Sequence, residues 1–342
     1  MFKRIAALLL VLCLLMTGFA FAEGTNPTET PAPEASVEPT STPEPTMSPE
    51  EAARLFEETD ESIYAEPKVT INKDDIAVNE DLDKTWRNIL LLGSDARPDS
   101  GRGRTDAMLI LSFNERTYEV KLTSLMRDIW TPMFGREPQK LSAAHVFGGA
   151  ELTIRTINED FGMNIEDYVL INMEGFEQVI ELMGGINMDI TEDEMQYINQ
   201  SYNAQEELIG EKLTEFGENT LLNGEQALAY VRLRKLDNDW ERTARQRKLI
   251  IAVVQKAIKL GGSELMSFIN ACMGYTETSL EFTEVLQLAA IGLQADVENI
   301  EQLRLPADGT YSSGVMEENK LWVMNPDFKK NTELLYDFIY GE

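Results

Sequence analysis

Basic side chains gather in one stretch of an otherwise acidic chain. The protein has 342 residues and a formal net charge of -29, yet the 19 residues from Tyr230 to Lys248 carry seven basic side chains against three acidic ones. We read this stretch as a loop that enters a long helix over about 240–260, with Asp237 or Asp239 as the N-cap residue. The local reversal of charge predicts a ligand of negative charge.

One face of that helix carries ions where its later turns carry hydrocarbon. The apolar positions that mark the core side are Leu249, Ile250, Val253, Val254 and Ala257. Arg242 and Gln246 fall within the same arc and Arg245 at its edge, and Asp239 joins them if the helix extends one turn upstream. Because unpaired ions do not tolerate burial, this face should line a cleft or meet an oppositely charged ligand. Arginine matches phosphate oxygens two at a time, which favours a phosphorylated ligand, and an Arg/Asp network that pairs with itself is the alternative.

Further polar motifs stand at the ends of predicted strands. GSDAR (93–97) follows an apolar run, RTD (104–106) precedes another, and Arg127 follows a looser alternation. Loops at strand ends are where α/β sheets place ligand chemistry. Asp95 and Asp106 are the best pair of oxygen ligands for Mg²⁺, which takes one or two carboxylates and fills its shell with water and phosphate oxygens. Each motif alone is common in turns, so their coincidence with the basic helix face carries the prediction.

Strands that alternate with helices predict the fold class. In chain order we expect strands at 88–92, 107–113 and 118–125, a helix at 149–161, a strand at 168–172, a helix at 174–183, a strand at 185–190, a helix at 282–293, a strand at 300–305 and a helix at 331–340. This order predicts an α/β layered domain. Residues 191–216 are acidic, and we read them as an irregular surface excursion.

The chain opens with an export segment and a tether. Residues 1–22 combine a basic start with an unbroken apolar run and a small-x-small cleavage site, so they form a signal peptide or an uncleaved membrane anchor. Either one places the rest outside the cytoplasm. Residues 23–50 hold seven of the 13 prolines and predict a disordered linker. Residues 51–85 form a poorly defined lead-in, and one domain occupies 86–342.

Composition argues against several classes of protein. The acidic balance excludes nucleic acid as the expected partner. Cys13 lies in the export segment and Cys272 is the other cysteine, so an internal disulfide and a cysteine-based metal cluster are excluded. His145 is the only histidine and is more typical of a packed side chain, which argues against Ser-His-Asp and Cys-His hydrolases. The sequence has no GxxxxGK phosphate loop.

Six sequence blocks in one order resemble a known family. They read GSDAR, RTDAM, SLMRD, KLSAAHVFGG, LNGEQALAYVRLRK and DNDWERTARQRK. Over roughly residues 86–260 the chain resembles the LytR-CpsA-Psr family of bacterial envelope proteins. The resemblance implies a single α/β/α domain with a central mixed sheet flanked by helices. It also implies an Mg²⁺-dependent phosphotransferase that works at the membrane surface and moves a glycopolymer from a polyprenyl-pyrophosphate carrier to peptidoglycan or another envelope acceptor.

The resemblance implies roles for the residues at matching positions. Asp95 and Asp106 would hold the metal. The basic residues that would bind the pyrophosphate are Arg97, Arg127, Lys140, Arg232 and Arg234. The catalytic residues would be Arg127, Asp239, Arg242, Arg245 and Gln246. Among them, Asp239 is a candidate base for the acceptor hydroxyl, and the apolar face of the 240–260 helix would contribute to a channel for the lipid.

Other function classes stay open at this point. A pyrophosphatase acting on the same carrier would use water in place of the acceptor. A non-catalytic envelope protein would bind the lipid pyrophosphate or the polysaccharide without turnover. A transcription factor conflicts with the export segment and the acidic surface. Family members are usually membrane-anchored, whereas this chain offers a cleavage site, so its attachment to the membrane is left open.

Overall fold

The computed structural model describes most of the chain from residue 66 onward. The described residues are 66, 68–96, 101–205, 207–233, 239–260, 262–292, 294–296, 299–317 and 320–341. The predicted signal peptide or anchor, the linker and the first part of the lead-in lie outside these residues.

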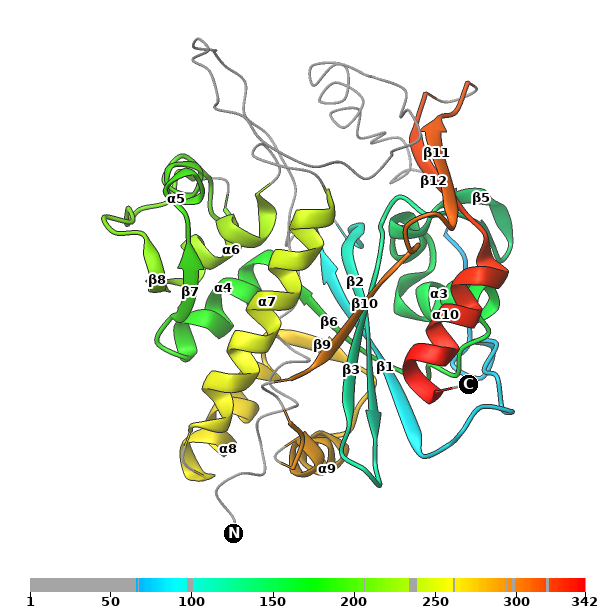
Figure 1. Cartoon of the computed structure of the whole chain (residues 1–342), viewed down its shortest axis with the longest axis horizontal. Helices are drawn as coiled ribbons and strands as arrows, with labels where there is room; N and C mark the ends of the chain where they lie inside the picture. Colours follow the sequence, from blue (N-terminus) through cyan, green and yellow to red (C-terminus); the bar gives the residue numbers. More distant parts are fainter. Residues whose placement is uncertain are drawn as a thin grey trace, which may run out of the picture.

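A mixed sheet of six strands forms the centre of the domain, in the order β10-β3-β2-β1-β6-β9 (Figure 1). Its strands are β1 Trp86–Ser94, β2 Thr105–Asn114, β3 Val120–Leu125, β6 Asp167–Asn172, β9 Thr276–Thr278 and β10 Glu301–Leu305. β1 pairs in parallel with β6, and β10 pairs in parallel with β3, while the other neighbours are antiparallel. The predicted mixed sheet is confirmed. β2 is buried along its whole length, as its continuous apolar run indicates.

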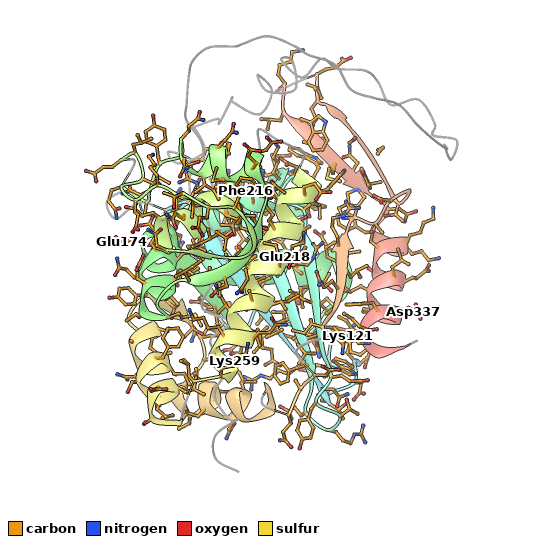
Figure 2. The ribbon with its side chains drawn as sticks, turned by 60° about the vertical axis from the view of Figure 1, so that its left-hand side comes forward. Lys121, Glu174, Phe216, Glu218, Lys259 and Asp337 are labelled. Carbon is orange, nitrogen blue, oxygen red and sulfur yellow. The ribbon has the colours of Figure 1, made fainter. Side chains whose placement is uncertain are left out.

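Helices cover both faces of this sheet (Figure 1). One face packs against α4 Met173–Leu182, α6 Gly224–Arg232, α7 Asp239–Ile258, α8 Gly262–Cys272 and α9 Phe282–Gly292. The other face packs against α3 Ala144–Phe161 and α10 Phe328–Tyr340. Exposed charges such as Lys259, just after α7, and Asp337 on α10 lie on the outside of the helices (Figure 2). The α/β/α layering is therefore the expected one.

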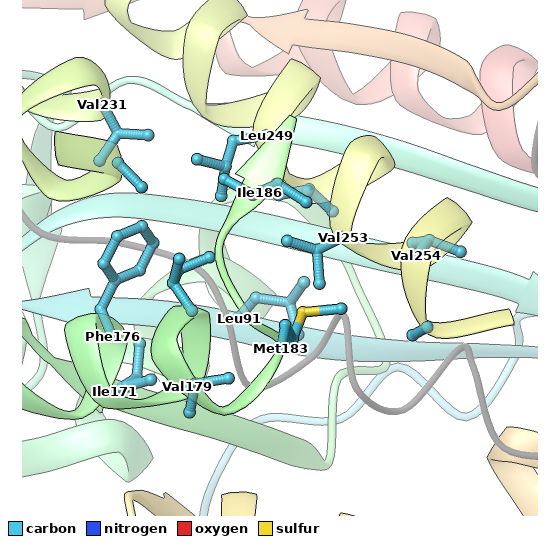
Figure 3. Packing of buried hydrophobic residues seen from close by; sticks show 14 of the residues in the cluster. Leu91, Ile171, Phe176, Val179, Met183, Ile186, Val231, Leu249, Val253 and Val254 are labelled. Carbon is cyan, nitrogen blue, oxygen red and sulfur yellow. The ribbon is translucent and has the colours of Figure 1, made fainter. Parts of the chain in front are cut away.

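The long helix α7 agrees with its predicted position and orientation. It ends at Ile258, and the apolar positions assigned to its core side are at most 1% exposed: Leu249, Ile250, Val253, Val254 and Ala257. These side chains meet Phe176, Val179 and Met183 at α4, together with Leu91 of β1 (Figure 3). A helical period of 3.6 residues fixes this face and, with it, the direction of the polar residues one and two turns upstream.

The basic stretch begins inside a helix, so the predicted loop is wrong for its first three residues. α6 runs to Arg232 and starts at Asn223, whose Oδ1 accepts from the Gln226 N–H at 2.9 Å. Gln226 Oε1 in turn accepts from the Asn223 N–H at 2.9 Å, which completes a capping box. The predicted N-cap Asp237 lies outside the described residues, and Asp239 is the first residue of α7.

The segment predicted as an irregular excursion contains a helix. α5 (Glu192–Ile198) starts at Thr191, whose Oγ1 accepts from the Glu194 N–H while Glu194 Oε2 accepts from the Thr191 N–H. The capping box stabilises a helix in a sequence whose acidity suggested a loop. The predicted strand before it, β7 (Ile186–Ile190), pairs with β8 (Gly217–Leu222) in a separate sheet of two strands.

The domain extends upstream of Trp86, where the sequence places its start. The Val69 N–H donates to the Phe147 carbonyl at 2.8 Å, and Asn158 Nδ2 donates to the Ile76 carbonyl at 2.8 Å. Ile76 is buried against the α3 side of the sheet. Two hairpins that the sequence did not predict complete the fold, formed by β4 Trp130–Met133 with β5 Arg136–Lys140 and by β11 Tyr311–Val315 with β12 Trp322–Pro326. No helix among the described residues has the length and apolar character needed to cross a membrane.

Candidate functional site

Antiparallel pairing brings three of the predicted motifs to one edge of the sheet. β1 ends, β2 begins and β3 ends at this edge, because β2 runs opposite to both of its neighbours. The register shifts between Gly93 and Ser94, and the Asp95 N–H donates to the Arg104 carbonyl at 3.0 Å. The loops that carry Asp95 and Asp106 are therefore tied directly to one another.

Asp95 packs closely against Gly103, and its Oδ1 atom is buried. A Cβ atom at Gly103 would lie 2.3 Å from Asp95 Oδ1, so only glycine permits this approach of the two loops. Among the described residues, Asp95 Oδ1 is buried and receives no hydrogen bond. Burial, followed by the neighbouring Asp106 carboxylate, raises the pKa of Asp95 to about 7. A cation bound between the two carboxylates would relieve both effects.

Arg127 stands at the centre of a buried set of charges, which we call the Arg127 cluster: Asp106, Arg127, Asp128 and Lys140. Arg127 NH1 donates to Asp106 Oδ1 at 2.9 Å, and Arg127 Nε donates to Asp128 Oδ2 at 3.3 Å. Lys140 Nζ lies 2.5 Å from the other oxygen of Asp128. Burial lowers the pKa of Lys140, and the attraction of Asp128 opposes that shift. The cluster places two cations and two carboxylates beside Asp95, in a site that an anionic ligand with a metal ion would suit.

The α7 face provides a second group of buried polar side chains, as its spacing predicts. Arg242, Arg245 and Gln246 are 1%, 5% and 3% exposed. Arg245 NH2 donates to the Leu233 carbonyl at 2.8 Å, and its NH1 lies 3.7 Å from Glu194 Oε1 on α5. Part of this face therefore pairs within the protein, which is the alternative that the sequence left open for it.

The sequence of this chain matches a known protein family and its members. The model of the LytR_cpsA_psr family matches residues 53–334. The chain belongs to this family. TagU of Halalkalibacterium halodurans, named a polyisoprenyl-teichoic acid–peptidoglycan teichoic acid transferase, is 31% identical over 227 residues, which are 65% of this chain and 70% of that protein. The resemblance seen in the six sequence blocks is confirmed.

Solved structures with the same fold include two related proteins. TagV of B. subtilis has a TM-score of 0.62 at 23% identity, over 75% of this chain and 98% of that one. The LytR-CPS2A-psr family protein YwtF (TagT) with bound octaprenyl pyrophosphate lipid has a TM-score of 0.58 at 22% identity, over 79% and 99% of the two chains. At these identities, the likeness shows that this LytR-CpsA-Psr domain shares their fold.

The other predicted site residues of this LytR-CpsA-Psr domain differ in what the structure describes. Arg232, at the end of α6, donates from NH1 to the Tyr202 carbonyl at 3.3 Å and so faces the segment after α5. Arg97 and Arg234 lie outside the described residues, and the side chain of Asp239 does so as well. The roles assigned to these four residues stay predictions, as does the lipid channel along α7, whose apolar side chains are packed in the core.

Sequence reasoning gave no role to Asp128 or Gly103. Asp128 is fully buried and joins Arg127 to Lys140, and Gly103 allows the contact with Asp95. The available signals were a carboxylate directly after Arg127 in SLMRD and a glycine two residues before Thr105 at the start of a strand. Neither signal reveals its contact, because each depends on a partner from another part of the chain.

Proposed function

We propose that this protein is an extracytoplasmic phosphotransferase of the cell envelope. It moves a glycopolymer from a polyprenyl-pyrophosphate carrier to peptidoglycan or to another envelope acceptor. The name of the H. halodurans relative and the lipid bound in the TagT structure support this assignment. The observation that carries it is the buried Arg127 cluster beside Asp95, since a family member that merely kept the fold would gain nothing from burying these charges.

The arrangement suits transfer at phosphorus. That chemistry needs little covalent help from the protein, because positioning the groups and neutralising charge on the phosphoryl and leaving oxygens do most of the work. Arg127 and Lys140 would neutralise part of that charge, and the buried side chains of Arg242 and Arg245 on α7 would contribute two further cations. Asp239 remains the proposed base that takes the proton of the acceptor hydroxyl, through its place at the start of α7.

Asp95 and Asp106 are the proposed Mg²⁺ ligands, and their surroundings fit that ion. Asp106 is buried and Asp95 is partly buried with its Oδ1 atom covered, and the raised pKa of Asp95 marks a place where negative charge lacks sufficient compensation. Two carboxylates suit Mg²⁺, which uses one or two of them together with water and substrate phosphates. When bound, the ion would neutralise the charge of the pyrophosphate oxygens.

The test is transfer in a defined mixture of full-length protein, a short-chain polyprenyl-pyrophosphate glycan, peptidoglycan fragments and Mg²⁺, with mass spectrometry of the products. We expect a phosphodiester-linked conjugate that disappears in Arg127→Ala and in Asp95→Asn and persists in Glu218→Gln, a change of an exposed carboxylate on β8. Lipid phosphate and phosphorylated glycan without any conjugate would instead establish hydrolysis. Tight pyrophosphate binding without turnover would establish a binding protein.

A further inference from the structure

A polar pocket opens at the loop that carries Asp95, next to the Arg127 cluster. It is a pocket of about 720 Å³, a size typical of ligand sites, in front of strands β1, β6 and β9 and the start of α3. Ser94 and Ala96 line it, so its wall includes both chain neighbours of Asp95. Leu170, which also lines it, faces the α3 side of the sheet, opposite the side that packs on α7. We call this pocket the α3-side groove.

The α3-side groove is more acidic than the Arg127 cluster, in which two cations balance two carboxylates. Among the described residues, its lining holds three carboxylates, Glu151, Glu174 and Glu277, and one guanidinium, that of Arg102. Glu277 Oε1 accepts from the Tyr168 hydroxyl at 2.9 Å, while Glu174 is exposed at the start of α4. A ligand that carries phosphate would be repelled here. The groove therefore suits a neutral ligand that donates hydrogen bonds.

His145 presents a hydrogen-bond acceptor to this groove. Its side chain is 4% exposed, and its Nδ1 lies 2.8 Å from the Gly103 carbonyl. Because a carbonyl oxygen only accepts, Nδ1 carries the proton and Nε2 holds a lone pair. Burial lowers the pKa of His145, which keeps the ring neutral. Among the described residues, no group is hydrogen-bonded to Nε2, so this acceptor can receive a hydrogen bond from a ligand hydroxyl in the groove.

Two further side chains give the groove the chemistry of a sugar site. Tyr275 is 40% exposed and offers an aromatic face for the apolar side of a sugar ring. Asn172 uses Oδ1 to accept from the Gly175 N–H at 2.9 Å, so its amide nitrogen remains a donor at the groove. Carboxylates, an amide, an imidazole acceptor and one aromatic ring together match a ligand with many hydroxyl groups.

We propose that the α3-side groove binds the glycan of the acceptor and delivers its hydroxyl to the phosphoryl group held near Asp95. The proposal rests on the transferase function proposed above and places the two substrates on either side of the Asp95 loop. The anionic donor binds at the Arg127 cluster and the neutral acceptor glycan binds in the acidic groove. The carboxylates of the groove would keep the anionic donor polymer out of the acceptor position.

Steady-state kinetics of the full-length protein separate the two substrates. We expect His145→Asn and Tyr275→Ala to raise the KM for peptidoglycan fragments about tenfold, in line with the loss of one good contact, and to leave the KM for the lipid donor unchanged. Asn is the most informative replacement for His145, since its amide can still donate to the Gly103 carbonyl but has no atom at the position of Nε2. Phe282→Ala, which truncates an aromatic side chain of similar exposure outside the groove, is the matched control for Tyr275→Ala.

An anionic competitor of the acceptor tests the role of the groove carboxylates. Oligomeric glycerol phosphate should not inhibit the wild-type protein as a competitor of the acceptor, whereas Glu174→Gln combined with Glu277→Gln should make it a measurable competitor. Glu218, which Figure 2 labels together with Glu174, is not among the residues that line the groove, so Glu218→Gln should leave inhibition unchanged. A rise in the donor KM in any groove variant, with the acceptor KM unaffected, would assign the groove to the donor and overturn the proposal.

A direct binding measurement tests the glycan site without requiring transferase activity. The probe is a neutral tetramer of β-1,4-linked N-acetylglucosamine, titrated into the protein by calorimetry or followed by NMR. We expect binding that weakens about tenfold in Tyr275→Ala and in His145→Asn, with thermal stability recorded to exclude unfolding. If the protein shows no transfer but this binding holds, the transferase function fails and the groove stands as a glycan site. If transfer occurs and the groove variants change neither acceptor KM nor tetramer binding, the proposal is wrong.

Discussion

Two buried arginines in this acidic protein are stabilised in different ways. Arg127 lies between Asp106 and Asp128, with nitrogen–oxygen distances of 2.9 and 3.3 Å, and Lys140 binds the far side of Asp128. Arg245 is as deeply buried, yet its short contact is with the Leu233 carbonyl, and the carboxylate of Glu194 lies 3.7 Å away. The described contacts of Arg127 are thus with two carboxylates, whereas those of Arg245 include a neutral carbonyl at short distance.

The difference has a consequence for ligand binding. An arginine held between two carboxylates keeps its position before any ligand arrives, but part of its charge is already used. A hydrogen bond to a carbonyl compensates less of the charge of an arginine than a hydrogen bond to a carboxylate does. We therefore expect Arg127 to contribute geometry and Arg245 to contribute attraction, and the variants below test this contrast.

Arg127→Ala is expected to have the largest effect. Removal of the cation leaves Asp106 and Asp128 buried without it, and breaking such a pair costs about 3–5 kcal/mol of the free energy of unfolding. The rate of transfer should fall by about 10²–10³, as when one preorganised donor is lost. Urea denaturation and the transfer assay measure the two effects. Arg127→Lys, which keeps the charge without the planar fork, should recover stability more than activity; equal recovery of both would contradict a geometric role.

Leu249→Ala tests the apolar part of α7, one turn after Arg245. Leu249 is fully buried, and its loss leaves a cavity between α7 and the sheet, which costs about 2–5 kcal/mol. Urea denaturation measures this loss, and the KM for both substrates should stay unchanged. A change of donor KM would show instead that this part of the core contacts the lipid.

Arg245→Met should destabilise the protein less than Arg127→Ala. It takes the cation away from Glu194, and it removes the hydrogen bond to the Leu233 carbonyl, which costs about 1–3 kcal/mol if that oxygen stays buried. Donor affinity should fall clearly and should lose part of its dependence on salt. Lys248→Met, which removes an exposed cation from the same helix, is the control. A destabilisation as large as that of Arg127→Ala would remove the contrast between the two arginines.

The smallest expected effect concerns Glu177, a buried carboxyl of α4 whose Oε1 accepts from the Ala204 N–H at 2.7 Å. Burial raises the pKa of Glu177 to about 7 from an ordinary value of 4.5. Between these two values the folded state keeps a proton that the unfolded state releases, so stability should fall as the pH rises from about 4.5 to 7. Melting temperatures over this range should fall less steeply in Glu177→Gln. An identical pH profile in the two proteins would show that Glu177 is ionised in the fold.

The elements that could be predicted from sequence are those whose signal is local. The apolar runs of β1 and β2 and the 3.6-residue period of α7 identified both the layers and the inward face that carries Arg242 and Gln246. Local composition led to a wrong prediction at α5, because the acidity of this segment suggested a loop and the capping box of Thr191 and Glu194 stabilises a helix. Composition also gave no indication that β7 would leave the central sheet to pair with β8.

The sequence placed the polar motifs at strand ends but did not reveal the contacts between them. Antiparallel pairing of β2 with β3 brings Asp106 and Arg127 to one edge of the sheet. The bridge from Asp128 to Lys140 depends on a hairpin, β4–β5, with no clear sequence signal. The α3-side groove needs β9, a strand of three residues that follows more than a hundred residues after its partner β6 and leaves little trace in the sequence.

One feature of the sheet also bears on how the chain folds. The edge strand β10 pairs with β3, and the register joins Glu301 to Lys121, so this strand arrives about 180 residues after its partner. Until β10 is in place, β3 presents an unpaired edge, which is a template for association with other chains. The nascent polypeptide must therefore remain without its final edge strand until nearly all of it has been synthesised. A chain truncated before residue 301 should aggregate rather than form a smaller working domain.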